Sequence, residues 1–82
     1  MNETRFSKYL TNLVRDRGAL ARLAERSGVS RSFISRICSG DVLPSVDMLG
    51  KLLSGLPLQA DRDHLALEFA LLHVPDVTPN VR

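Results

Sequence analysis

Residues 22–49 have the sequence RLAERSGVSRSFISRICSGDVLPSVDML, in which a glycine separates two short segments with helical periodicity. The apolar residues of each segment recur three and four positions apart, which predicts one helix over residues 19–26 and another over residues 31–38. Gly28 supplies a left-handed backbone to the turn between them, and Ser30 is a typical N-terminal cap for the second helix. Two short helices joined by such a turn predict a helix-turn-helix unit.

The same periodicity predicts three more helices around this unit. Phe6, Tyr9, Leu10, Leu13 and Val14 form one apolar stripe and predict a helix over residues 3–17. A fourth helix is expected to follow the cap Ser45 and to stop at Gly55, and a fifth is expected over residues 59–74. No segment alternates convincingly with a period of two, so the predicted fold class is all-α.

The fifth predicted helix is apolar almost all round, since only Glu68 and His73 are polar within residues 65–74. Such a helix must be buried on more than one side, which points to a second copy of the chain as a partner. The alternative is that the first and fourth helices of the same chain cover both sides. The predicted dimer contacts are Leu67, Phe69, Leu71, Leu72 and Val74. We therefore expect one domain over residues 1–74 and a flexible tail over residues 75–82.

The charged residues are unevenly distributed along the 82 residues of the chain. Residues 1–40 carry eight basic and three acidic side chains, a net charge of +5. Residues 41–82 carry three basic and six acidic side chains, a net charge of −3. This split indicates a polyanionic partner for the first half, and an unevenly charged solvated surface is the alternative interpretation.

The composition and the motifs argue against several classes of protein. There is no apolar run long enough to span a membrane and no apolar segment of a signal peptide, so we expect a cytoplasmic protein without a membrane partner. No phosphate-binding loop, nucleophile motif or set of metal-ligand spacings occurs, so we expect no catalytic residue, no metal and no cofactor. Asp61, Asp63 and Glu68 are interpreted as an acidic face of the fifth helix.

The helix predicted over residues 31–38 is the second helix of the helix-turn-helix. The side chains on its predicted outer face are short and polar or cationic, and none is acidic. Its members are Arg31, Ser32, Ser35 and Arg36. A face of this kind suits the major groove of DNA. Two neighbours have two interpretations each: Phe33 packs against the preceding helix or reaches a thymine methyl or a sugar, and Cys38 is a small packing residue or a redox-sensing thiol.

Residues 22–49 resemble the Cro and phage-repressor (XRE-like) type of helix-turn-helix. The resemblance covers about residues 4–57 and is carried by Leu23-Ala24-Glu25, Gly28-Val29-Ser30, Ile34-Ser35-Arg36-Ile37, Gly40 and Leu43-Pro44-Ser45. It implies a five-helix, lambda-repressor-like DNA-binding domain, with the helix-turn-helix at about residues 19–38 and a dimerisation helix at about residues 59–74. The implied partner is double-stranded DNA.

The resemblance also implies roles for individual residues. The expected base contacts are Arg31, Ser32, Ser35 and Arg36, with a phosphate contact or a solvated side chain as the alternative for each arginine. The expected phosphate contacts are Arg22, Ser30, Ser39 and Ser45. One departure is Ala19-Leu20-Ala21, because many members carry a phosphate-binding glutamine there; Arg22 or backbone amides are then expected to replace it.

The resulting hypothesis is that the chain is a homodimeric, sequence-specific transcription regulator of a bacterial or phage-infected cell. More specifically, it would be a phage or prophage repressor that binds a palindromic operator. A second hypothesis is an antitoxin that binds a toxin protein and autoregulates its operon. A third is a protein-interaction domain that has lost DNA binding, which the cationic face at Arg31 and Arg36 argues against.

Overall fold

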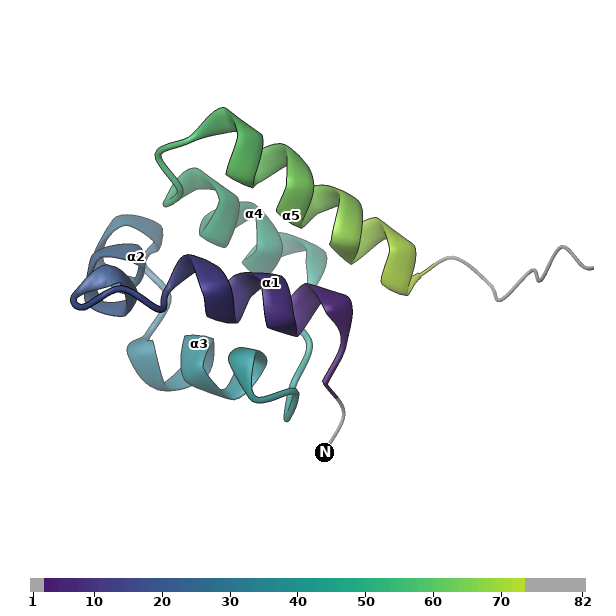
Figure 1. The fold of residues 1–82 in the computed structure, drawn as a ribbon, viewed down its shortest axis with the longest axis horizontal. Coiled ribbons are helices and arrows are strands. Elements are labelled where there is room, and N and C mark those ends of the chain that lie inside the picture. The colour runs from purple at the N-terminus through teal and green to yellow at the C-terminus, as the bar shows by residue number, and fades with distance from the viewer. Residues whose placement is uncertain (1–2, 74–82) are drawn as a thin grey trace, which may run out of the picture.

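The computed structural model describes residues 3–73, which form five helices and no strand (Figure 1). The helices are α1 (Arg5–Leu13), α2 (Ala19–Ser27), α3 (Arg31–Cys38), α4 (Val46–Ser54) and α5 (Gln59–Leu72). The predicted all-α class is confirmed. The predicted tail over residues 75–82 and the predicted contact residue Val74 lie outside the described residues.

One predicted boundary is wrong, because α1 ends at Leu13 rather than at Arg17. The apolar stripe of this helix stops at Val14, so another turn would bury nothing. The chain instead turns through residues 14–18, and Gly18 adopts a left-handed conformation (φ 82°) before α2 begins. The end of the apolar stripe, and not the next glycine, therefore marks the end of this helix.

Side-chain caps fix the starts of three helices. Thr4 forms a reciprocal capping box with Ser7 at the start of α1. The predicted caps Ser30 and Ser45 are both confirmed: each hydroxyl oxygen accepts a hydrogen bond 3.1 Å long, from the backbone N–H of Phe33 and of Met48 respectively. These contacts satisfy backbone donors that the first turn of a helix leaves without partners.

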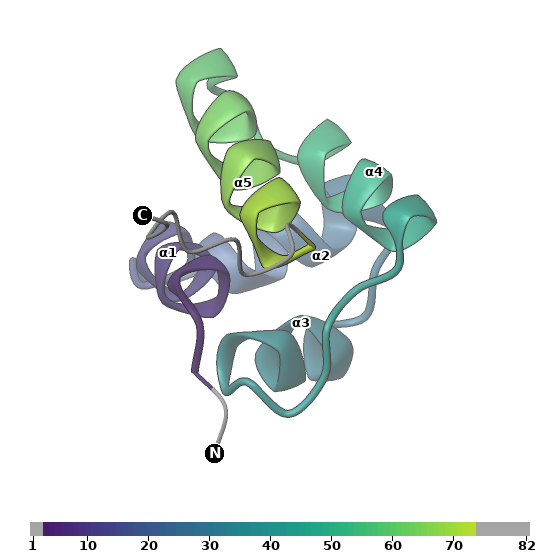
Figure 2. The same cartoon turned by 90° about the vertical axis from the view of Figure 1, so that its right-hand side faces the viewer.

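The helices surround one core, with α1 between α3 and α5 (Figures 1 and 2). In both views α3 and α5 lie at opposite ends of the domain, while α2 packs against α3 and α4. The fully buried apolar side chains are Phe6, Leu10, Ile34, Ile37, Leu52 and Leu65. Every helix except α2 contributes at least one of them, and α2 adds Leu23, which is 4% exposed. The position of α3 therefore depends on the shared core.

The turn between α2 and α3 depends on Gly28, as predicted. Its φ is 77°, and its N–H donates to the carbonyl of Ala24 at 2.9 Å, which closes the end of α2. The buried hydroxyl of Ser27 accepts from the N–H of Val29 at 3.1 Å, so the donor that follows the turn is also satisfied. A Cβ on Gly28 would meet no atom within 4 Å, so the demand for glycine comes from the backbone conformation alone.

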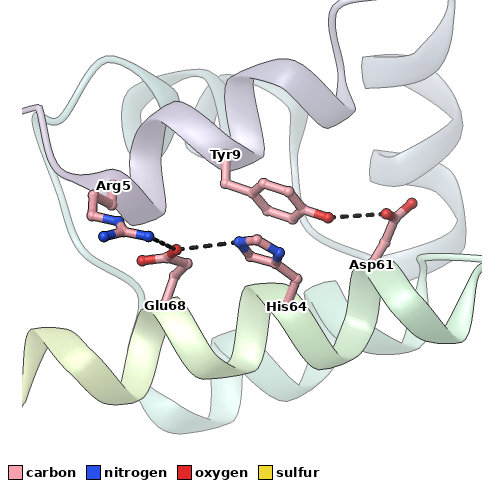
Figure 3. A network of polar contacts seen from close by, with 5 residues as sticks. All are labelled: Arg5, Tyr9, Asp61, His64 and Glu68. Atoms are coloured by element: carbon pink, nitrogen blue, oxygen red, sulfur yellow. Dashed lines mark hydrogen bonds and ion pairs between the residues drawn. The ribbon is translucent and has the colours of Figure 1, made fainter.

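A polar network joins α1 to α5 (Figure 3). Glu68 is 4% exposed and is not part of a solvated acidic face, so that interpretation is wrong for this residue. Its Oε2 lies 3.1 Å from Nη2 of Arg5 and 3.2 Å from Nε2 of His64. The ring of Tyr9 stacks on His64 with centroids 4.0 Å apart, and its hydroxyl donates to Asp61 at 3.0 Å. A buried carboxylate is tolerated when its oxygens have such partners.

Replacement of Gly28 with alanine should lower the free energy of unfolding by about 1–2 kcal/mol, because a left-handed backbone disfavours a Cβ. Gly50 offers a matched control, since it lies inside α4, is exposed and has no atom within 4 Å of an added Cβ. Gly50→Ala should stabilise the protein by about 0.5–1 kcal/mol. Chemical denaturation measures both values, and destabilisation of the same size by both variants would contradict the assignment.

Alkaline pH should destabilise the fold through Tyr9. Burial, with the hydrogen bond to Asp61 and the charge of that carboxylate, raises the pKa of Tyr9 above its ordinary value. The stabilising contribution is therefore complete below about pH 10 and is lost as the pH rises through the raised pKa. Tyr9→Phe should be less stable at neutral pH, because the bond to Asp61 is lost, but its stability should fall less steeply above about pH 10.

Phenolate absorbance reports this pKa directly, because Tyr9 is the only tyrosine and the chain has no tryptophan. The absorbance of the native protein should rise at a higher pH than that of the same chain in denaturant. Equal midpoints for the two states would contradict the role given to Tyr9.

Candidate nucleic-acid interface

The outer face of α3 presents together all four residues predicted to contact bases. Arg31, Ser32, Ser35 and Arg36 are exposed, whereas Ile34 and Ile37 on the opposite side are fully buried. The two isoleucines anchor the helix, so the rotation of α3 about its axis is set by the core. The exposed face is thus a continuous strip with an arginine near each end and small hydroxyl side chains between them.

Residues 3–73 do not neutralise the charge of this face through ion pairs. Among residues 3–73 the ion pairs all involve Glu68, far from α3, so neither Arg31 nor Arg36 is paired within the described part of the chain. Glu25 lines the same open hollow between α2 and α3 as Arg31, without forming an ion pair with it. Both guanidinium groups therefore keep their donors available for an anionic or acceptor-rich partner.

The predicted phosphate contacts differ in how their side chains are engaged. Ser30 and Ser45 use a hydroxyl oxygen to accept from a backbone N–H, which leaves each O–H free to donate to a phosphate oxygen. Ser39 instead donates its O–H to the carbonyl of Arg36 at 3.0 Å. Arg22 is exposed on α2, and its guanidinium lies over Gly18 at the start of that helix.

Phe33 and Cys38 flank the buried side of α3. Both are half-buried and pack against the core, which favours the packing interpretation for each. Burial raises the pKa of the Cys38 thiol, and the nearby hydroxyl of Thr11 opposes this effect only in part. A thiol with a raised pKa holds little reactive thiolate at neutral pH, so the structure argues against the redox-sensing interpretation.

The described residues contain no group of three or more His, Cys, Asp or Glu side chains placed to share a metal ion. Within the same part of the chain, no helix has the length and apolar composition needed to cross a membrane.

A family model described as helix-turn-helix matches residues 19–62, just over half of the chain. The chain belongs to the Cro/XRE-like helix-turn-helix family. This family consists of DNA-binding transcription regulators, and the protein is one of them. Searches of curated proteins and of solved structures returned no match. The match runs from the start of α2 to the first turn of α5, so it contains the whole cationic face of α3.

The α5 residues predicted to form a dimer lie outside this match and are divided by the structure. Phe69 is 7% exposed and Leu72 is half-buried, so both pack within their own chain. Leu67 is 58% exposed and Leu71 is 49% exposed, one helical turn apart. We call the surface of Leu67, Ala70 and Leu71 the outer face of α5; Ala70 is exposed as well.

Sequence reasoning missed two features that surround the helix-turn-helix. The network of Glu68 joins residues 63 positions apart, and no local pattern marks such a pair. The other feature is a cavity between α2 and the connection from α4 to α5, which is lined in part by Arg22 and Arg26. The signal for the network was Glu68 itself, a lone acid inside an otherwise apolar run.

Proposed function

We propose that this helix-turn-helix protein is a sequence-specific repressor of the phage-repressor type, which binds a palindromic operator as a homodimer. One observation carries the proposal. The strip of Arg31, Ser32, Ser35 and Arg36 is exposed, contains no acid and is held in a fixed rotation by buried isoleucines. Its chemistry suits the major groove, where arginine donates two hydrogen bonds to guanine O6 and N7.

The serines at helix starts support a consistent set of backbone contacts. Ser30 lies immediately before α3 and Ser45 immediately before α4, and each has a free O–H beside the positive end of a helix. A phosphate at such a position accepts from the hydroxyl and from backbone amides together. In this proposal these contacts fix the register of α3 on the duplex, and the arginines of α3 then select the sequence.

The outer face of α5 supports the homodimer. Leu67 and Leu71 expose apolar surface that residues 3–73 do not cover, and this face lies on a helix remote from α3 (Figures 1 and 2). A second copy could therefore pair there while both copies keep α3 available for DNA. Two-fold symmetric pairs of this motif bind half-sites about 34–36 Å apart, which accounts for a palindromic operator.

An antitoxin remains the second candidate, because the same uncovered face of α5 suits a toxin protein as well as a second copy. The two candidates differ in the mass of the operator complex. A repressor should place two copies of this chain alone on one operator. An antitoxin should bind its operator fully only when the toxin is also present, and a neighbouring toxin gene would favour it.

Arg31→Ala and Arg36→Ala should each weaken operator binding by about 1–3 kcal/mol, or roughly 5- to 150-fold, and relax the sequence preference at one position per half-site. Selection from a random DNA pool first identifies the operator, and titration at fixed salt measures affinity for the operator and for random DNA. Lys51→Ala is the control, because Lys51 is exposed on α4 and lies outside the α3 face. Unchanged affinity and specificity in both arginine variants would overturn the proposal.

Leu67→Glu and Leu71→Glu should each shift the protein toward monomers, because a carboxylate at a buried apolar contact loses its hydration. We expect the dimer to dissociate at least about tenfold more readily, as measured by sedimentation equilibrium. Leu58→Glu is the matched control, since Leu58 is 60% exposed but lies at the other end of α5. A monomeric wild-type protein, or dissociation caused only by Leu58→Glu, would refute the assignment.

A further inference from the structure

A partly enclosed cavity of about 140 Å³ lies between α2 and the connection from α4 to α5. Its apolar wall includes Leu13 from the end of α1, Leu23 from α2, and Leu56 from the connection. A cavity of about 150 Å³ is large enough for a benzene molecule. The cavity is thus of a size that fits a small compact organic group.

The charged side chains that line this cavity have a net positive charge. Arg22 and Arg26 line it from α2, and both are exposed and free of ion pairs among residues 3–73. Asp61 lines it from α5, but its Oδ1 already accepts a hydrogen bond from Tyr9 (Figure 3). Two guanidinium groups beside one carboxylate leave a net charge of +1, which matches a ligand with a single negative charge.

The guanidinium of Arg22 is held close to the start of α2. A Cβ on Gly18 would lie 3.0 Å from its Nη1 atom, so the side chain folds back over that glycine. Gly18 also provides no side-chain cap, and Ala19 in the first turn of α2 lines the cavity together with Arg22. Arg26 follows Arg22 by one helical turn, so both cations line the cavity from the same helix, together with the three leucines.

We propose that this cavity binds a small organic monocarboxylate with a compact apolar body, about the size of benzoate. The carboxylate accepts hydrogen bonds from Arg22 and Arg26, in the geometry that guanidinium groups offer to carboxylates. The apolar body lies against Leu13, Leu23 and Leu56. The binding itself does not depend on the proposed repressor function, because it needs neither DNA nor a second copy.

A ligand at this position should weaken DNA binding, and this step rests on the proposed function. Arg22 is one of the proposed phosphate contacts, so a bound carboxylate and a DNA phosphate would compete for the same guanidinium group. The cavity also joins the first helix of the helix-turn-helix to the first turn of α5. The ligand would then act as an inducer that releases the operator.

The binding test uses the free 82-residue chain and benzoate, followed by nuclear magnetic resonance of the backbone amides. We expect saturable shifts that centre on the cavity, with a Kd on the order of 1 mM. Neutral benzamide should bind about tenfold more weakly, and so should benzoate to Arg26→Gln, whereas Lys51→Gln should bind like wild type. Ala19→Leu, which fills the cavity and keeps both arginines, should also lose binding.

Three outcomes would overturn the site. They are the absence of saturable binding by benzoate, butyrate and hexanoate, equal affinity for benzoate and benzamide, and undiminished binding to Arg26→Gln. Arg26 is exposed, so that variant tests the site even if Ala19→Leu fails to fold.

The second test measures operator affinity at saturating benzoate. Wild-type protein should bind its operator at least about fivefold more weakly, and benzamide should have no effect. Saturable benzoate binding with unchanged operator affinity would overturn the competition and leave the site intact. Failure to find any operator would count against the proposed repressor function, but it would not change the benzoate binding measured on the free chain.

Discussion

The burial of Ile34 and Ile37 is the constraint on which the rest of this structure depends. Both side chains are completely inaccessible, and each contributes roughly 1.5–3 kcal/mol by leaving water. An eight-residue helix such as α3 has little stability of its own, so these two contacts hold it in place. They also fix its rotation, which turns Arg31 and Arg36 outward. Packing inside the domain and the exposed cationic face outside it are consequences of the same alternation along one short helix.

Besides contributing to the core, α2 and α4 place polar and cationic groups at their N-terminal ends. The start of α2 brings Arg22 over Gly18, and Ser45 caps α4 while keeping its O–H free. Cationic and donor groups therefore stand at helix starts around α3, where backbone amides already attract anions. At Ser30 and Ser45 one hydroxyl group caps a helix through its oxygen and keeps its O–H for the proposed phosphate contact.

Local patterns predicted the helices well, and they failed where distant residues meet. The bounds of α3 and the caps Ser30 and Ser45 follow from nearest-neighbour rules of periodicity and capping, and all were foreseen. The sequence did not predict that Phe69 of α5 is buried while Leu67 is exposed. Both residues belong to apolar stripes of the same helix, and only the packing of the other helices determines which stripe is buried. The lone acid Glu68 inside an apolar run was a local signal, but nothing local identified its partner Arg5, 63 positions away. The face of α3 was foreseeable because a short amphipathic helix has only one outward side.

The contact between Arg5 and Glu68 has a consequence for synthesis of the chain. It joins residues 63 positions apart, so it forms only after almost the whole domain has been made. Contacts among α2, α3 and α4 involve short loops and can form earlier, since closing a short loop costs less entropy. A nascent chain without α5 would leave Phe6 and Tyr9 of α1 without the Phe69 and His64 rings that they contact. Helix α1 therefore reaches its final packing only after α5 has been made, although α2, α3 and α4 already lie close together in the sequence.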